Sequence, residues 1–455
     1  MTPCLMSSIG AMAPVLQGRL QDVQSAVTMD ELVAAVTMLV RELGVLMLEA
    51  VLAEQAAAAA EWPECPTCGR SLRSRGWARR EVATTLGLVR WQRRVGRCPG
   101  GCRIGQMAPL DEALGVAPNQ RHSTELKRAA TLVAVFVPLA TAVAILTRLV
   151  HVRLGASTLW HWIQSVGRQA QVELETELAE LSAGGEVARE PLEAMLQELA
   201  LLIGADGVMV PFRPQAGSPK GATVWREVKV AVLARLGRRR NRLGRTVTTL
   251  RQRRLVAVLG DIDQLARRLR LEALRQGLLS APRVVWVSDG ARGLWRLYRE
   301  TLADLGVTGV LDFYHTVGQL WTAAEVWYCQ YLPSAHQWLD QARHDLRHGR
   351  AAELVASLQS AAWAGHRSKE HRDILLRVAD FLDKHQAHLA YPALKADGLP
   401  IGSGFVESAV KWLIQQRFKG VGMRWSQDGF ENLLMLRLAW ANDRFDLLFA
   451  PSPNS

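Results

Sequence analysis

The sequence has little of what marks a secreted or membrane protein. Its N-terminus lacks a basic region followed by an apolar core and a cleavage site, the pattern of a secretory signal peptide. A single uncharged run, residues 129–146, approaches the length of a membrane span, but Pro138 and two threonines interrupt it. A pair of buried helices accounts for this run better than a membrane helix. We therefore expect a cytoplasmic protein with no membrane partner.

Cysteine is also scarce, with six residues in 455. Four of them form two tight pairs, Cys65-Pro-Thr-Cys68 and Cys98-Pro-Gly-Gly-Cys102, separated by a stretch that can fold as a hairpin. Two such knuckles supply four thiolates for tetrahedral zinc, with a pair of disulfides as the alternative. Because four protein ligands leave no open position on the metal, we predict a structural zinc ribbon.

Negative charge is in deficit, because 43 acidic residues face 55 lysines and arginines, which gives a net charge of +12. Such an excess points to a polyanionic partner, by default nucleic acid. Residues 237–245 are crowded with arginine, and residues 416–425 mix cations, glycines and aromatics, as a loop that grips a backbone and stacks on bases requires. The candidate DNA contacts are Arg238, Arg239, Arg240, Arg417, Lys419, Arg424 and Trp425.

A second candidate for DNA contact lies in residues 139–166, which read as helix, turn and helix. Ser157 is a good N-cap for the second helix. In a helix-turn-helix motif that helix enters the major groove. A plain helical hairpin describes the same residues equally well.

Aspartates recur where apolar runs end. Asp206 lies between two such runs and is followed by glycine, so it is either held at the end of a buried strand or part of an Asp-Gly hairpin turn. Asp289 and Asp312 each close another strand-like run. Two further strands are expected at 223–233 and 255–259, and a helix capped by Asp261 follows them. A carboxylate at a strand end is rigid yet accessible, which suits a metal ligand.

The order strand, strand, strand, helix, strand, helix, strand is that of an α/β ribonuclease-H-like fold with a mixed five-stranded sheet. In that fold the carboxylates of the first and fourth strands meet at the centre of the sheet. Residues 316–395 are almost entirely helical in pattern and are interpreted as an insertion. After them Gly402 to Gly404 lead into a helix that carries Glu407 in its early turns.

With these motifs the chain resembles bacterial insertion-sequence transposases of the DDE superfamily, of the Kra type, which are related to the Mutator-like transposases of eukaryotes. The resemblance covers most of residues 60–440 and is carried by several short motifs in order. They are Gly204-Ala-Asp-Gly, Val258-Leu-Gly-Asp, Ser288-Asp-Gly-Ala, Leu311-Asp-Phe-Tyr-His315, Ile401-Gly-Ser-Gly-Phe-Val-Glu-Ser and Gly422-Met-Arg-Trp-Ser426. One departure is the segment after Asp289, where a more aromatic stretch is expected and the role of Trp295 is left open.

The resemblance implies a DNA transposase, an enzyme that binds terminal inverted repeats of double-stranded DNA and catalyses strand cleavage and strand transfer. Asp206, Asp289 and Glu407 would hold two Mg²⁺ or Mn²⁺ ions. His315 would orient water or grip the scissile phosphate, or would be purely structural, and Asp312 would be an extra ligand or hold the strand end. A homo-oligomer is expected on DNA, and the protein would be nucleoid-associated. The alternatives are a structure-specific nuclease on the same fold and a non-catalytic DNA-binding protein derived from a transposase.

The expected organisation has seven parts. They are an N-terminal helical region (1–62), the zinc ribbon (63–108), a helical, helix-turn-helix-like region (109–186), the first part of the catalytic core (187–315), the helical insertion (316–397), the C-terminal helices of the core (398–442) and a tail (443–455).

Overall fold

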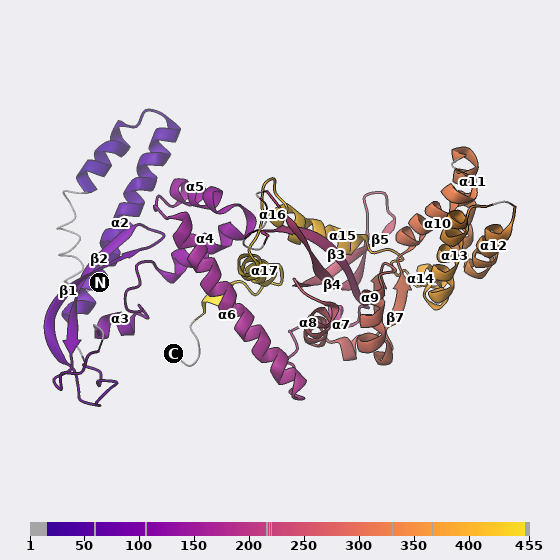
Figure 1. Cartoon of the computed structure of the whole chain (residues 1–455). Coiled ribbons are helices and arrows are strands. Elements are labelled where there is room, and N and C mark those ends of the chain that lie inside the picture. The colour runs from indigo at the N-terminus through magenta and orange to yellow at the C-terminus, as the bar shows by residue number, and fades with distance from the viewer. Residues whose placement is uncertain are drawn as a thin grey trace. The chain divides into compact units, whose positions relative to one another are not determined.

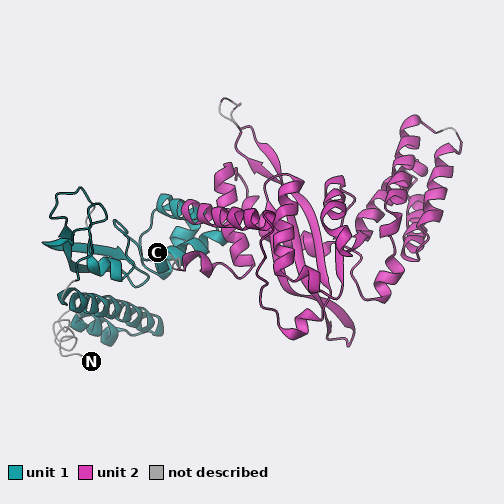
Figure 2. Ribbon diagram, turned by 90° about the horizontal axis from the view of Figure 1, so that it is seen from below, with its two compact units in different colours: residues 1–163, 451–455 teal, residues 164–450 magenta. Residues whose placement is uncertain are grey.

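The computed structural model describes residues 16–58, 61–104, 107–214, 217, 219, 221–329, 331–365 and 367–450. The described chain divides into two compact units, and the division falls between Ile163 and Gln164, inside one long helix (Figure 2). Each unit is described by itself.

The first unit begins with a helical segment, residues 16–25, followed by helix α2 (Met29–Ala57). Thr28 starts α2 through a capping box, in which its side chain accepts from the Glu31 amide and the Glu31 carboxylate accepts from the Thr28 amide. Helix α2 packs along a hairpin of β1 (Arg73–Ala83) and β2 (Leu88–Arg97) (Figure 1). Leu52, Val82, Val89 and Trp91 form the small core between them.

Four helices follow in the chain: α3 (Pro109–Ala113), α4 (Thr124–Phe136), α5 (Leu139–Leu149) and α6 (Ala156–Ser182). Pro138 stands between α4 and α5, so the long apolar run of the sequence becomes two short helices. No helix among the described residues is both long and apolar enough to cross a membrane. Helix α6 begins at Ala156, so Ser157 lies in its first turn and not at the predicted capping position.

The second unit is built on a five-stranded mixed sheet (Figure 1). Its strands are β3 (Leu201–Phe212), β4 (Val224–Arg240), β5 (Thr246–Val258), β6 (Val284–Ser288) and β7 (Thr308–Leu311). Their spatial order is β5-β4-β3-β6-β7. The pairs β5–β4 and β4–β3 are antiparallel, whereas β3–β6 and β6–β7 are parallel.

Helices cover both faces of this sheet. Gly204 of β3 faces α15 (Gly404–Val410), because a Cβ built on Gly204 would meet Phe405 and Val406. Its neighbours Ile203 and Ala205 must point to the opposite face. They belong to a core that also contains residues of α8 (Ile262–Arg275) and α9 (Arg292–Leu297). Helix α17 (Gln427–Ala441) packs against β5.

The chain between β7 and α15 is helical, as the sequence predicts. It forms α10 (Phe313–Trp327), α11 (Leu332–Arg347), α12 (Ala351–Trp363), α13 (Lys369–Lys384) and α14 (Tyr391–Ala396). These helices return to the sheet at its parallel edge. Phe381 of α13 lies against Gly290, and His388 forms a hydrogen bond with the Gly309 carbonyl.

One expectation about the strands needs correction. Asp206 does not end its strand and is not in a hairpin turn, because β3 continues to Phe212 and Gly207 still pairs with Lys229 of β4. The arginine-rich stretch at residues 237–245 belongs to a hairpin, because β4 runs through Arg240, β5 begins at Thr246 and the turn is confined to residues 241–245. In both places the ladder to the neighbouring strand supplies backbone partners that turn-forming residues alone do not reveal.

Candidate active site

Asp206 lies where the parallel part of the sheet ends. Ala205 pairs with Ser288, the last residue of β6, and Asp206 is the next residue along β3. The carboxylate is half-buried and accepts a hydrogen bond of 2.7 Å from the Gly207 amide. The sheet therefore fixes Asp206 beside the point where the chain leaves β6.

Asp289 is that first residue after β6. Its side chain accepts from the Ala291 amide at 3.0 Å, which closes the turn into α9. Its carbonyl accepts from Nε1 of Trp295 at 2.6 Å. Trp295 is buried and so anchors the backbone of Asp289, which gives this tryptophan a positioning role that the sequence left open.

Glu407 reaches the same region because α15 lies directly on β3. A Cβ at position 204 would come within 2.5 Å of Phe405 Cζ, 2.7 Å of Val406 Cγ2 and 2.9 Å of the Val287 carbonyl oxygen. Only glycine allows so close an approach of the helix. Gly204 and Asp206 share one face of the strand, so α15 brings Glu407 to the face that carries Asp206. The Glu407 side chain is 47% exposed and lies 3.8 Å from Lys411.

Asp312 links the end of β7 to the loop before α15. It is 1% exposed, caps α10 by accepting from the His315 amide at 2.8 Å, and accepts from the Ser403 hydroxyl at 2.5 Å and from the Ser403 amide. Burial alone would raise the pKa of Asp312, but the hydrogen bonds from His315 and Ser403 hold it at about 2. With its oxygens already accepting protein hydrogen bonds, Asp312 holds the strand end and the α15 loop. Sequence reasoning missed Ser403, although its two flanking glycines mark a tight approach.

His315 carries a positive charge at neutral pH. Its Nδ1 lies 3.3 Å from Asp312 Oδ1, and its side chain is 45% exposed. The hydrogen bond with Asp312 raises the pKa of His315 to about 9, with burial opposing and the charges of Asp312, Asp289 and Asp206 adding to the rise. The site thus presents two cations beside its carboxylates, His315 near Asp312 and Lys411 near Glu407.

The predicted carboxylates act on one another electrostatically. Burial raises the pKa of Asp206, and the charges of Asp289 and Glu407 raise it further, while the Gly207 amide and His315 lower it. Asp206, Asp289, Glu407 and His315 are therefore gathered in one region. Among the described residues, the group whose donor atoms all lie within 4.8 Å of one another is a different one, the four cysteines of the first unit.

Those cysteines form the candidate metal centre that the sequence predicts. Cys65, Cys68, Cys98 and Cys102 come from the two turns that flank the β1–β2 hairpin. The Gly100 amide donates to Cys98 Sγ at 3.2 Å. Hydrogen bonding, first from the Cys102 amide, lowers the pKa of Cys98 to about 6. Four sulfurs so arranged can bind a structural metal such as zinc.

The arginines of the β4–β5 hairpin lie far from the carboxylates. Asp206 pairs with Val230, and Arg238 follows Val230 along β4 by about 26 Å at ~3.3 Å per residue, beyond the start of β3. Arg238 donates to the Asp397 carbonyl at 2.9 Å. Arg239 and Arg240 are exposed at the hairpin tip.

The residues of the other candidate DNA loop lie past the opposite end of β3. Trp425 bridges to Phe212, roughly 20 Å along the strand from Asp206. Lys419 and Arg424 are exposed, but Arg417 is 3% exposed and lies over the Trp425 ring at 5.4 Å. Arg417 thus packs within the protein and supports Trp425, unlike the surface contact expected for it.

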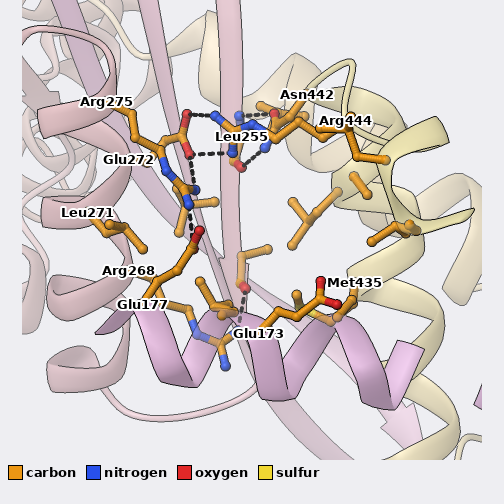
Figure 3. Close-up of a pocket in the computed structure, with 18 residues that line it drawn as sticks. Glu173, Glu177, Leu255, Arg268, Leu271, Glu272, Arg275, Met435, Asn442 and Arg444 are labelled. Carbon is orange, nitrogen blue, oxygen red and sulfur yellow. Dashed lines mark hydrogen bonds and ion pairs between the residues drawn. The ribbon is translucent and has the colours of Figure 1, made fainter. Parts of the chain in front are cut away.

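A cavity of about 240 Å³ lies elsewhere in the second unit, between α6, β5, α8 and α17 (Figure 3). None of Asp206, Asp289 or Glu407 is among its described lining residues. Glu272 borders it between two arginines, 3.4 Å from Arg275 and 2.7 Å from Arg444 (Figure 3). This network fastens the segment after α17 to α8.

No protein-family model matches the chain, and no curated protein matches it. Among solved structures, a Drosophila P element transposase strand transfer complex is similar at 12% identity and a TM-score of 0.24. That similarity covers 74% of this chain and 83% of the other.

Proposed function

We propose that the protein is a DNA transposase of the DDE type, with a ribonuclease-H-like catalytic core. The observation that carries this proposal is the convergence of three carboxylates from distant parts of the chain. Asp206 stands on the central strand, Asp289 follows the adjacent parallel strand, and Glu407 is delivered by a helix docked on Gly204. The strand order β5-β4-β3-β6-β7, with three antiparallel strands and two parallel ones, is the order expected of that core.

The donor set fits divalent magnesium or manganese. Carboxylate oxygens are the ligands that these ions prefer, and like charges crowded around Asp206 raise its pKa, a repulsion that a cation would relieve. Asp206, Asp289 and Glu407 would hold two ions. When bound, such ions activate water or a 3′-hydroxyl and stabilise the leaving oxygen of a phosphodiester.

The remaining residues of the site have distinct tasks in this proposal. His315, positively charged and partly exposed, would hold a non-bridging oxygen of the scissile phosphate. Asp312 would orient His315 and, through Ser403, keep the α15 loop in place. Trp295 would keep Asp289 in register with β6.

DNA would be held at several places outside the carboxylates. Arg238, Arg239 and Arg240, all exposed, at one end of the sheet and Lys419 and Arg424 at the other would contact phosphates. Arg417, buried against Trp425, would support the second of these surfaces from within. A DNA track long enough to touch both ends would cross the carboxylates. The zinc ribbon and the α5–α6 pair of the first unit would add sequence-reading contacts to terminal repeats.

The test uses a supercoiled plasmid that carries the coding region with its flanking DNA. The full-length protein should cut at the element ends in Mg²⁺ and join them to target DNA. Asp206→Asn should abolish both steps and leave DNA binding intact, whereas Asp304→Asn, at an exposed position outside the site, should cut normally. Cutting by Asp206→Asn at the normal rate would refute the assignment. Cutting without joining by the unaltered protein would favour a nuclease.

A further inference from the structure

Helix α2 presents three faces, and two of them are covered. Val45, Leu48 and Leu52 face the β1–β2 hairpin and pack in its core. On a second face Glu42 pairs with Arg19 of the preceding helical segment at 2.6 Å. On these two sides α2 therefore contacts other parts of the chain, as an ordinary packed helix does.

The third face is an exposed apolar stripe. Its members are uncharged and recur at spacings of four, three, four, three, four and four residues, close to the period of a coiled-coil seam. They are Met29 (73% exposed), Val33 (56%), Val36 (39%), Val40 (60%), Leu43 (half-buried), Met47 (44%) and Val51 (37%). Among the described residues, none packs against this stripe closely enough to bury it.

The spacing of the stripe is nearly the same in both directions from Val40. Met29, Val33 and Val36 precede Val40 by 11, 7 and 4 residues, and Leu43, Met47 and Val51 follow it by 3, 7 and 11. A two-fold axis through Val40 would therefore lay the stripe on a second, antiparallel copy of itself. Self-complementarity of this kind is the requirement of an isologous interface.

We propose that the stripe on α2 (Met29, Val33, Val36, Val40, Leu43, Met47 and Val51) is a dimer interface that takes a second copy of this chain. The two α2 helices pack antiparallel about Val40, with Val33 against Met47 of the other copy. The contact leaves the hairpin face of α2 untouched, so the zinc ribbon and the interface coexist. The proposal does not depend on the catalytic assignment.

The mass of the full-length protein in solution without DNA is the first test. The unaltered protein should have twice the chain mass of 50.3 kDa at micromolar concentration by analytical ultracentrifugation. Val33→Glu with Val40→Glu places charges in the seam and should shift the mass to that of one chain, with the dissociation constant weakened at least 100-fold. Because both valines are more than half exposed in the single chain, the variant should fold and retain zinc.

The matched control is Ala34→Glu with Thr37→Glu, which adds the same charges to exposed positions of α2 outside the stripe and should remain dimeric. A monomeric unaltered protein would overturn the proposal, and so would a dimer indifferent to the charges in the stripe.

Disulfide trapping tests the antiparallel geometry separately. In a background in which Cys4 and Cys329 are serine, Val40→Cys should link two chains under mild oxidation, because residues on a two-fold axis meet their own counterparts. Ala34→Cys on the other side of α2 should not. Absence of a linked Val40→Cys dimer, or equal linking at both positions, would overturn the arrangement.

Discussion

Replacing Gly204 by alanine tests how the site is assembled, because helix α15, which carries Glu407, packs directly against this glycine. The added Cβ would lie 2.5 Å from Phe405 Cζ and 2.9 Å from the Val287 carbonyl oxygen, and a backbone oxygen within a sheet cannot easily move away. Since Phe405 and Val406, 2.5 and 2.7 Å from the added Cβ, both belong to α15, we expect this helix to shift outward. Overpacking of this kind costs about 1–3 kcal/mol of folding free energy.

The effect on activity should exceed the effect on stability. A displacement of a catalytic group by 1 Å can lower a rate by about 100-fold. We expect Gly204→Ala to lose about that factor in Mg²⁺-dependent strand cleavage, measured in single turnover, and to lose about 1–3 kcal/mol in urea unfolding.

Gly404→Ala is the matched control for this experiment. Gly404 is the first residue of the same helix, and a Cβ there would meet nothing within 4 Å. This variant should cleave normally and be no less stable than the unaltered protein. If Gly204→Ala were as stable and as active as Gly404→Ala, the close packing of α15 on β3 would be refuted.

Three further predictions concern His315 and two other parts of the molecule, the four-cysteine centre and the Glu272 network. Asp312 raises the pKa of His315 from 6.5 to about 9, so His315 gains affinity for its proton on folding. Its contribution to stability should therefore be fully present below pH 6.5 and lost as the pH rises through 9. The His315→Gln variant should lack this pH dependence in urea unfolding, and a pH profile equal to that of the unaltered protein would contradict the pairing. Cys98→Ser should lower the zinc content measured by atomic absorption to well below one ion per chain, and an undiminished content would exclude the four-cysteine centre. Glu272→Ala removes a carboxylate that is 5% exposed and pairs with Arg275 and Arg444, which keep Glu177 and Glu190 as partners, so it should cost about 1–3 kcal/mol in urea unfolding. The exposed Glu300→Ala should cost less than about 0.5 kcal/mol, and equal losses would show that the network is not stabilising.

The sequence predicts the local parts of this site well. The apolar runs before Asp289 and Asp312 become short buried strands, because short apolar runs that contain β-branched residues and end in aspartate favour a strand. The helix capped by Asp261 is also confirmed, since the cap, a side-chain bond to the Gln264 amide, is a contact between near neighbours.

The features of the site that the sequence does not predict depend on contacts between residues far apart in the chain. Asp206 lies within a strand and not at its end, because β4 continues the ladder past it. The delivery of Glu407 depends on the absence of a side chain at Gly204, which no local pattern around Glu407 reveals. Arg417 belongs to a basic, aromatic loop by composition, yet its guanidinium is buried against Trp425.

The pairing register of the strands also decides which cationic side chains stand close to the carboxylates. Arg240 lies past the start of β3, and Lys419 lies over Trp225, which pairs with Pro211 near the other end of β3, so neither stands beside Asp206. Arginine content along the sequence predicts a polyanionic partner but not this separation, which appears only once the strands are aligned.

The central claim, that Asp206, Asp289 and Glu407 form one metal site, is tested most directly by Mn²⁺ binding in the zinc-loaded, full-length protein, measured by isothermal titration calorimetry. The unaltered protein should bind Mn²⁺, and Asp206→Asn, Asp289→Asn and Glu407→Gln should each weaken that binding by at least tenfold. Binding unchanged in all three variants would contradict the account.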